Sequence, residues 1–217
     1  MIGDVQVRNR GTIGGSIAHA DPGADFPVIL TALNASFVLQ STSGSRTVAA
    51  DDFFIDFYTT AMAANEVLTE IRVPLPTAGS GTAYVKLPHP ASGYVVVSAG
   101  ALIARQPSGS CALARVALGG LGSGPIRAMA TETELQGKPL TPEVIAAAAA
   151  KAAEGDGPGG RHLRERGIQA PRSDRLCAAG DRSGSETGGE FKAVLVMRDR
   201  ARLLSRTRTT DTNTIVF

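Results

Sequence analysis

The sequence predicts an α+β fold in which helices and strands are mixed without a repeating strand–helix–strand unit. Two observations predict this class. In residues 1–78, a helical segment is followed by short segments in which apolar and polar residues alternate, as in half-buried strands. In residues 79–155, three strand-like segments precede two helical ones, an order typical of a small antiparallel sheet covered by helices.

In the first part, local signals set the element boundaries. Asp25 and Pro27 favour the start of a helix, because a carboxylate suits the helix dipole and proline suits the first turn. Small polar residues at 42–45 separate two strand-like runs, which is a hairpin signal. The expected elements are a turn at 11–16, a helix at 26–34, strands at 36–40 and 46–49, a short helix at 51–57 and a strand at 66–74.

The second part begins after a segment rich in turn-forming residues, 74–82, which we take as the boundary between two domains. Thr141 is the kind of residue that caps a helix, and Pro142 follows it at the first helical position. The expected elements are strands at 83–87, 94–104 and 112–118, followed by helices at 126–135 and 141–154.

Residues 156–217 differ from the rest in composition. They hold 12 of the 22 Lys and Arg residues and 8 of the 20 Asp and Glu residues, and they show little periodicity. We expect this basic tail to be poorly ordered, with a strand or helix at 191–197 as its one candidate element. Acidic residues are interspersed among the basic ones, and few aromatic residues are available to stack on bases. The tail is therefore a poor candidate for binding nucleic acid, and no nucleic-acid partner is expected.

Composition and cysteine usage narrow the function. The chain has 217 residues, of which 43% are hydrophobic and 19% charged, and its net charge is +2. Cys111 and Cys177 lack the spacing of an iron–sulfur or zinc site, so we expect no metal in this chain. No signal peptide or apolar run long enough for a membrane span is found, which predicts a soluble, cytoplasmic protein without a membrane span.

The most informative stretch is Gly-Thr-Ile-Gly-Gly-Ser at 11–16, followed by Asp21 and Asp25. Adjacent glycines let backbone N–H groups approach an oxygen-rich ligand, and the hydroxyls of Thr12 and Ser16 add hydrogen-bonding groups. A plain turn explains the glycine pair as well. The stretch matches neither the phosphate-binding loop, which needs a following Lys-Ser/Thr pair, nor the dinucleotide fingerprint, which needs a different spacing and a preceding strand.

A longer stretch carries a family resemblance. Residues 7–27, Val-Arg-Asn-Arg-Gly-Thr-Ile-Gly-Gly-Ser-Ile-Ala-His-Ala-Asp-Pro-Gly-Ala-Asp-Phe-Pro, closely resemble the second FAD-binding motif in the medium, flavoprotein subunit of molybdenum hydroxylases of the carbon monoxide dehydrogenase and xanthine dehydrogenase type. Residues 117–122 and 125–128 resemble that subunit's C-terminal domain. The resemblance implies the second half of a PCMH-type FAD-binding domain at 1–78, the C-terminal domain at 79–155, and FAD as cofactor.

The resemblance also implies which residues would bind FAD. A set of five would contact the pyrophosphate and ribityl region: Thr12, Ile13, Gly14, Gly15 and Ser16. Asp25 would accept hydrogen bonds from ribityl or ribose hydroxyls, Lys86 would lie near the isoalloxazine edge, and Tyr94 would lie beside the ring.

Simpler structural roles compete with each of these assignments. Ile13 is equally explained as a core anchor, Asp25 as a helix cap, Lys86 as an exposed strand lysine and Tyr94 as a core tyrosine. Asp21 is interpreted as a turn former before Pro22. No catalytic residue is expected, and His19 and His89 are poor candidates for one.

The function implied by the resemblance is electron transfer. The chain would take electrons from 2Fe-2S clusters of a small subunit, which receive them from a large subunit carrying the molybdenum cofactor, and pass them through FAD to an external acceptor. The family's first glycine-rich FAD motif and its usual C-terminal helix are not found in this sequence, so we expect half of the FAD site. The alternative is a family remnant that does not bind FAD and acts at most as an interaction module.

Overall fold

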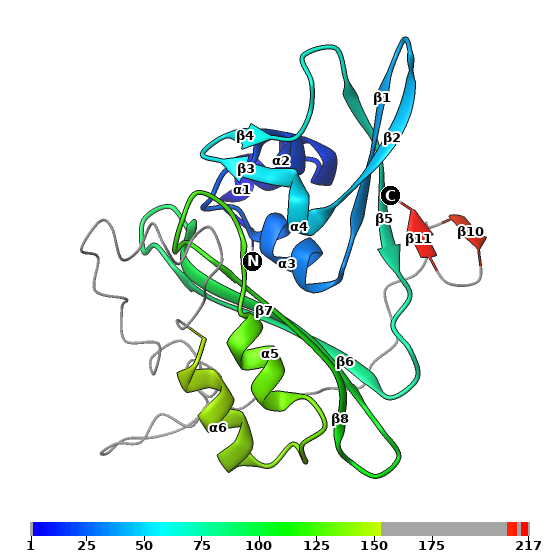
Figure 1. The fold of residues 1–217 in the computed structure, drawn as a ribbon. Coiled ribbons are helices and arrows are strands. Elements are labelled where there is room, and N and C mark those ends of the chain that lie inside the picture. Colours follow the sequence, from blue (N-terminus) through cyan, green and yellow to red (C-terminus); the bar gives the residue numbers. More distant parts are fainter. Residues whose placement is uncertain (1, 153–207, 212–213, 217) are drawn as a thin grey trace.

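The computed structural model of the chain describes residues 2–152, 208–211 and 214–216 (Figure 1). Its helices are α1 (Val5–Arg10), α2 (Ile13–His19), α3 (Asp25–Ala32), α4 (Ala50–Phe53), α5 (Met129–Leu135) and α6 (Pro142–Ala150). Its strands are β1 (Ser36–Ser41), β2 (Gly44–Ala49), β3 (Phe54–Asp56), β4 (Thr59–Thr60), β5 (Val67–Pro74), β6 (Ser80–Pro88), β7 (Val95–Arg105), β8 (Cys111–Gly119), β9 (Ile126–Arg127), β10 (Arg208–Asp211) and β11 (Thr214–Val216). This mixture of helices and antiparallel sheets confirms the α+β prediction.

The first sheet has the order β10-β11-β5-β1-β2, and all of its pairings are antiparallel. Its core is built on Phe37 and Leu39 of β1, which are fully buried together with Phe53 of α4 and Ile17 of α2. The rings of Phe37 and Phe53 lie 4.5 Å apart between centroids, a distance typical of favourable tilted ring pairs. Aromatic packing thus holds α4 against this sheet, and aliphatic packing of Ile17 holds α2.

The second sheet has the order β6-β7-β8-β9 and lies between two layers of helix (Figure 1). Helix α3 packs on one face, and α5 and α6 pack on the other, where Ile103 and Ala114 meet Leu135 and Ala148. Because both faces are covered, β7 is buried along almost its whole length, and its residues do not show the alternation of a strand with one wet face.

Helix α3 joins the two halves of the fold, because it has apolar side chains on two sides. Leu30 belongs to the core of the first sheet, whereas Val28 and Ala32 pack on Ala117 of β8. The approach of α3 to the second sheet depends on glycine: a Cβ atom added at Gly119 would lie 2.4 Å from Val28 Cγ2.

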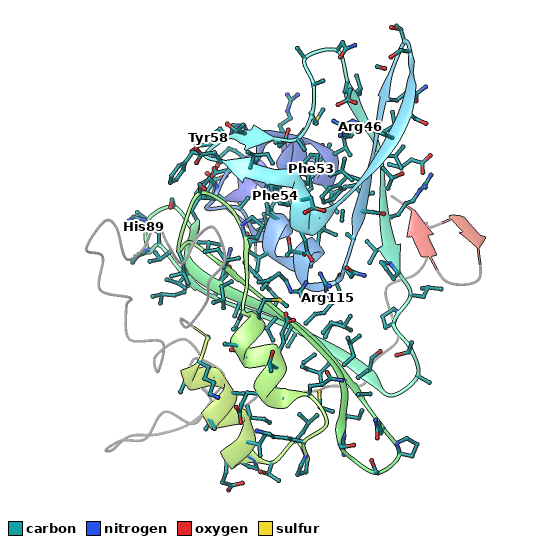
Figure 2. The ribbon with its side chains drawn as sticks, viewed as in Figure 1. Arg46, Phe53, Phe54, Tyr58, His89 and Arg115 are labelled. Atoms are coloured by element: carbon teal, nitrogen blue, oxygen red, sulfur yellow. The ribbon has the colours of Figure 1, made fainter. Side chains whose placement is uncertain are left out.

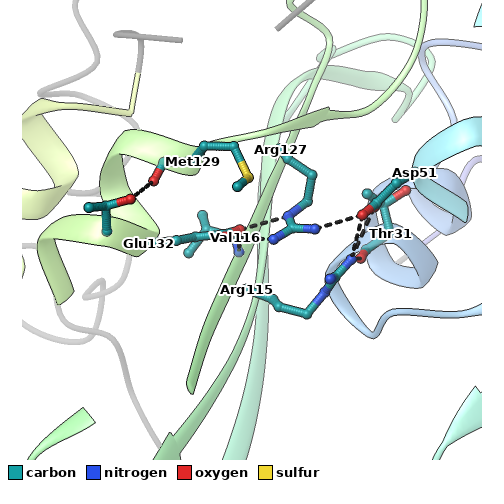
Figure 3. Close-up of polar contacts among 8 residues, drawn as sticks. Thr31, Asp51, Arg115, Val116, Arg127, Met129 and Glu132 are labelled. Atoms are coloured by element: carbon teal, nitrogen blue, oxygen red, sulfur yellow. Dashed lines mark hydrogen bonds and ion pairs between the residues drawn. The ribbon is translucent and has the colours of Figure 1, made fainter. Parts of the chain in front are cut away.

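Ion pairs reinforce the same junction (Figure 3). Asp51 of α4 accepts hydrogen bonds from Arg115 of β8 at 3.0 Å and from Arg127 of β9 at 2.7 Å. Arg115 also donates to the carbonyl oxygen of Thr31 at 3.0 Å, and Arg127 is bonded in turn to Glu132 of α5. One chain of charges thus runs from α4 across β8 and β9 to α5.

Most of the expected elements are confirmed within one to four residues at each end: the helix at 26–34, the hairpin strands, the strand at 66–74, the three strands after residue 79 and the helix after Thr141. Three expectations need correction. The 11–16 segment is not a turn but the start of α2. Thr12 is the N-cap, and the two glycines, Gly14 and Gly15, belong to the first turn of the helix. The segment at 51–57 is helical only to Phe53, and the segment at 126–135 begins as strand β9 before α5.

The basic tail falls largely outside the described residues, including the candidate element at 191–197 and Cys177. The described part contains two strands that the sequence did not predict, β10 and β11, and β11 pairs with β5. Across residues 2–152 and these two strands, none of the helices combines the length and the apolar character that a membrane crossing needs.

Candidate functional site

The glycine motif lies at the start of α2. Thr12 is its N-cap, and the Thr12 Oγ1 atom accepts a hydrogen bond from the Gly15 N–H at 3.0 Å. The N–H groups of Ile13 and Gly14 belong to the first turn, which has no intrahelical acceptors and carries the positive end of the helix dipole. Ser16 completes this turn, and its N–H donates to the Thr12 carbonyl at 3.0 Å.

The two glycines of the motif have different surroundings. A Cβ atom at Gly15 would lie 2.9 Å from Thr12 Oγ1, so a side chain there would disturb the cap. A Cβ atom at Gly14 would meet nothing within 4 Å, so this position opens onto free space at the helix start. Ile13, by contrast, packs against the core of the first sheet, which supports its interpretation as a core anchor.

Asp25 is the first residue of α3 and lies in a buried cluster with two side chains of β6. Its Oδ1 accepts a hydrogen bond from Tyr84 Oη at 2.8 Å, and its Oδ2 accepts one from Lys86 Nζ at 3.0 Å. Only 4% of Asp25 and 9% of the Lys86 side chain are exposed. Lys86 is therefore not the exposed strand lysine that a simpler interpretation of the sequence would give.

Tyr84 is the member of this cluster that sequence reasoning missed. Burial raises the pKa of its phenol well above the ordinary value, and the neighbouring Asp25 carboxylate acts in the same direction. Tyr84 therefore stays protonated and donates to Asp25 at neutral pH. The one sequence signal was its position two residues before Lys86, which places both side chains on the same face of a strand.

The loop between β6 and β7 closes over this cluster. Lys86 Nζ also donates to the carbonyl oxygen of Gly93 at 3.1 Å, and the Val95 N–H donates to the carbonyl oxygen of Gly23 at 3.2 Å. Tyr94, between them, is 41% exposed and so is not a core tyrosine. Asp21 forms the predicted turn, because its Oδ1 accepts a hydrogen bond from the Gly23 N–H at 2.8 Å.

The predicted residues thus fall into two groups. The first is the start of α2, from Thr12 to Ser16, and the second is the cluster of Asp25 and Lys86 with the Tyr94 loop above it. His19 and His89 lie outside both. The His19 ring is tilted by 46° to that of Tyr58, with 5.1 Å between the centroids, and His89 Nδ1 lies 3.3 Å from Ser92 Oγ. Tyr58 and His89 are labelled in Figure 2. In the described part of the chain, no three His, Cys, Asp or Glu residues gather as a metal site would require.

These residues fit a flavin nucleotide. The start of α2 offers amide donors, the positive end of a dipole and open space at Gly14, which suits a phosphate group. Lys86 offers a buried ammonium group that Asp25 keeps fixed. The Asp25 carboxylate already accepts two hydrogen bonds, and a carboxylate has further lone pairs with which it can accept one from a hydroxyl.

Two family models match the chain. The FAD binding domain in molybdopterin dehydrogenase matches residues 1–76, and the CO dehydrogenase flavoprotein C-terminal domain matches residues 82–161. The carbon monoxide dehydrogenase medium chain of Hydrogenophaga pseudoflava is 42% identical over 149 residues, which are 69% of this chain and 52% of that one. The glyceraldehyde dehydrogenase medium chain of Sulfolobus acidocaldarius is 43% identical over 150 residues, 69% of this chain and 53% of that one.

Solved structures agree with these matches. Carbon monoxide dehydrogenase from Hydrogenophaga pseudoflava superposes with a TM-score of 0.66 at 44% identity, covering 70% of this chain and 53% of that one. Quinoline 2-oxidoreductase from Pseudomonas putida 86 gives a TM-score of 0.64 at 36% identity, covering 75% and 58%. This chain spans about half the length of the curated relatives it matches. It belongs to the FAD-binding medium subunits of the molybdenum hydroxylase family.

Proposed function

We propose that this chain binds FAD and serves as the electron-transfer flavoprotein subunit of a molybdenum hydroxylase. In this role it passes electrons from the iron–sulfur clusters of a partner subunit through FAD to an external acceptor. The observation that supports the proposal most is that Asp25 and Lys86, which the family resemblance implies as flavin contacts, meet in one buried cluster. Their elements belong to the two parts of the chain that the two family models match.

Each part of the proposed site has its own task. The N–H groups at the start of α2, with the hydroxyls of Thr12 and Ser16, bind the pyrophosphate and ribityl region. Asp25 orients a sugar hydroxyl, and Tyr94 lies beside the flavin ring. FAD supplies the redox chemistry when it is bound. Lys86 contributes a fixed positive charge, which stabilises negative charge on a neighbouring ring system.

The proposed partners are a small subunit that carries 2Fe-2S clusters and a large subunit that carries the molybdenum cofactor. The names of the relatives support an assembly of several subunits, since they are called medium chains or subunits of dehydrogenases. Neither nucleic acid nor a membrane span forms part of the proposal. A cytoplasmic location stays a prediction from the sequence.

The alternative is a pair of family domains that folds without binding FAD. Asp25 and Lys86 satisfy each other inside the protein, with help from Tyr84 and Gly93, so the cluster also has a purely structural explanation. The two functions differ in one measurable quantity, the affinity of this chain for FAD.

FAD titration of the purified chain, followed by flavin fluorescence and by absorbance near 450 nm, tests the proposal. We expect saturable binding. A Kd weaker than about 1 mM, which corresponds to about −4 kcal/mol, would instead support the structural alternative.

A matched pair of variants locates the binding. Gly14→Ala fills the open space at the start of α2 without a clash, and alanine favours a helix over glycine by up to about 1 kcal/mol. We therefore expect weaker FAD binding with unchanged or slightly raised stability. Ala18→Ser, at an exposed position near the other end of the same helix, is the control and should bind FAD as the unmodified chain does.

A further inference from the structure

Tyr84 and Lys86 hold the same carboxylate from the same strand. They lie two residues apart on β6, so their side chains leave the sheet on one face. Tyr84 Oη donates to Asp25 Oδ1 at 2.8 Å, and Lys86 Nζ lies 2.9 Å from Oδ1 and 3.0 Å from Oδ2. Asp25 is 59 and 61 residues away from them along the chain. The contact therefore forms only when α3 docks on β6.

The orientation of the carboxylate depends on both donors. An ammonium group that faces both oxygens attracts them about equally, so it fixes the position of the charge better than the rotation of the carboxylate plane. Tyr84 donates to Oδ1 alone and so distinguishes the two oxygens. A buried carboxylate needs such donors, because each oxygen left without one costs desolvation energy.

Tyr84 is itself well fixed. The partly buried Tyr84 packs against the cluster that Val28 and Ala32 of α3 form with Ala117 of β8. Its hydroxyl is protonated at neutral pH, as any phenol is, and burial raises its pKa further. The side chain thus presents one permanent donor at one position.

We propose that Tyr84 is a positioning residue of the flavin site: its hydroxyl orients the Asp25 carboxylate and, through it, holds the Lys86 ammonium in place. The effect on Lys86 follows from the contacts within this chain. The effect on the flavin rests on the proposed function. Tyr84→Phe removes only the hydroxyl and keeps the packed ring, so it separates positioning from packing.

The first test uses the chain without flavin. Lysines are acetylated with a limiting amount of an N-hydroxysuccinimide ester, and the rate at each site is followed by mass spectrometry. We expect Lys86 to react about tenfold faster in Tyr84→Phe. The variant removes the hydrogen bond from Tyr84 Oη to the Asp25 carboxylate, which is worth about a factor of ten or more, and so loosens the carboxylate that holds Lys86. Lys138, whose side chain is 46% exposed, serves as the internal standard.

Tyr58→Phe is the matched control. It removes the same hydroxyl from a tyrosine that is 59% exposed and lies on the β3–β4 hairpin (Figure 2). Lys86 should react in this variant at the unmodified rate. Incorporation of 3-fluorotyrosine at position 84 provides a second variant with the ring and hydroxyl retained; its more acidic hydroxyl is a stronger donor and should slow the reaction of Lys86.

The second test measures FAD affinity and the flavin reduction potential. We expect Tyr84→Phe to weaken FAD binding about tenfold, equivalent to about 1.4 kcal/mol, and to shift the potential, whereas Tyr58→Phe changes neither. Unchanged Lys86 reactivity in both position-84 variants would overturn the proposal. If the unmodified chain binds no FAD while Lys86 reactivity rises in Tyr84→Phe, the proposed function fails but the positioning of Lys86 by Tyr84 stands.

Discussion

The Lys86 ammonium lies 2.9 Å from the Asp25 carboxylate, and the two side chains bury each other where α3 meets β6. An ion pair this buried costs desolvation energy to form, so its net contribution to stability is small, but the loss of one partner is severe. The pair therefore makes α3 and β6 depend on each other.

A double-mutant cycle measures this dependence. Asp25→Ala and Lys86→Met are each expected to lower the free energy of unfolding by about 3–5 kcal/mol, because each leaves an uncompensated buried charge. The double variant should lose clearly less than the sum of the two. Urea denaturation gives the three values, and strictly additive losses would show that the two groups do not interact.

Gly119 sets the distance between α3 and the second sheet. A Cβ atom there would lie 2.4 Å from Val28 Cγ2 and 2.7 Å from Ser98 Oγ. Gly119→Ala should therefore cost about 1–3 kcal/mol through overpacking. Val28→Ala in the same chain removes the clashing methyl groups, so thermal unfolding should show the double variant to be more stable than additivity of the two losses predicts.

Asp51 and Glu132 lie in one network of ion pairs, but they should contribute differently to the free energy of unfolding. The Asp51 side chain is 36% exposed, so Asp51→Ala is expected to cost about 1 kcal/mol, and less at high salt. The Glu132 side chain is 9% exposed and accepts hydrogen bonds from the Val116 N–H and Arg127 at 2.7 Å, so Glu132→Ala should cost about 3 kcal/mol.

Thermal unfolding at low and high salt distinguishes these cases. Asp52→Ala, at the exposed neighbour of Asp51, is the control and should leave the melting temperature within about 1 °C. If Asp51→Ala and Glu132→Ala lowered the stability equally, the expectation that the more buried carboxylate contributes more would be wrong.

Protonation of Glu66 should make the protein less stable at low pH. The hydrogen bond from Arg46, together with one from the Ala63 N–H, lowers the pKa of this carboxyl from 4.5 to about 2. Because the pKa is lower in the folded chain, the stabilisation is complete above about pH 4.5 and is lost as the pH falls towards 2. Melting temperatures from pH 2 to 7 should therefore fall less steeply at the acid end in Glu66→Gln.

Elements with a clear hydrophobic periodicity could be predicted from the sequence. Features that depend on contacts between residues far apart in the chain could not. Alternation along β5 reflects one buried face, as expected of a strand that packs on a core with one side only. The start of α2 was mistaken for a turn because its glycines have low helix propensity, although Thr12 carried the capping signal. The helix ends after Phe53 because Phe54 has an extended backbone and begins strand β3.

The candidate site divides in the same way. The family resemblance implied flavin roles for Asp25 and Lys86, and these roles stay predictions. Their pairing and the contact with Tyr84 bring together residues about 60 positions apart, which no local sequence window contains. The assignment of Thr12 to Ser16 and of Tyr94 to a flavin stays a prediction. Here the structure contributes a specific geometry, with a capped helix start and an exposed ring, that binding measurements can test.

The connection between β5 and β6 has a practical consequence. Residues 76–79 form an exposed link, whereas the sheets on either side are joined through α3, the Asp51 network and the Asp25–Lys86 pair. A chain cut within this link should therefore behave as two complementing fragments, which recover a common fold when they are mixed. Because Asp25 and Lys86 would lie on different fragments, the candidate site would form only when the two fragments associate.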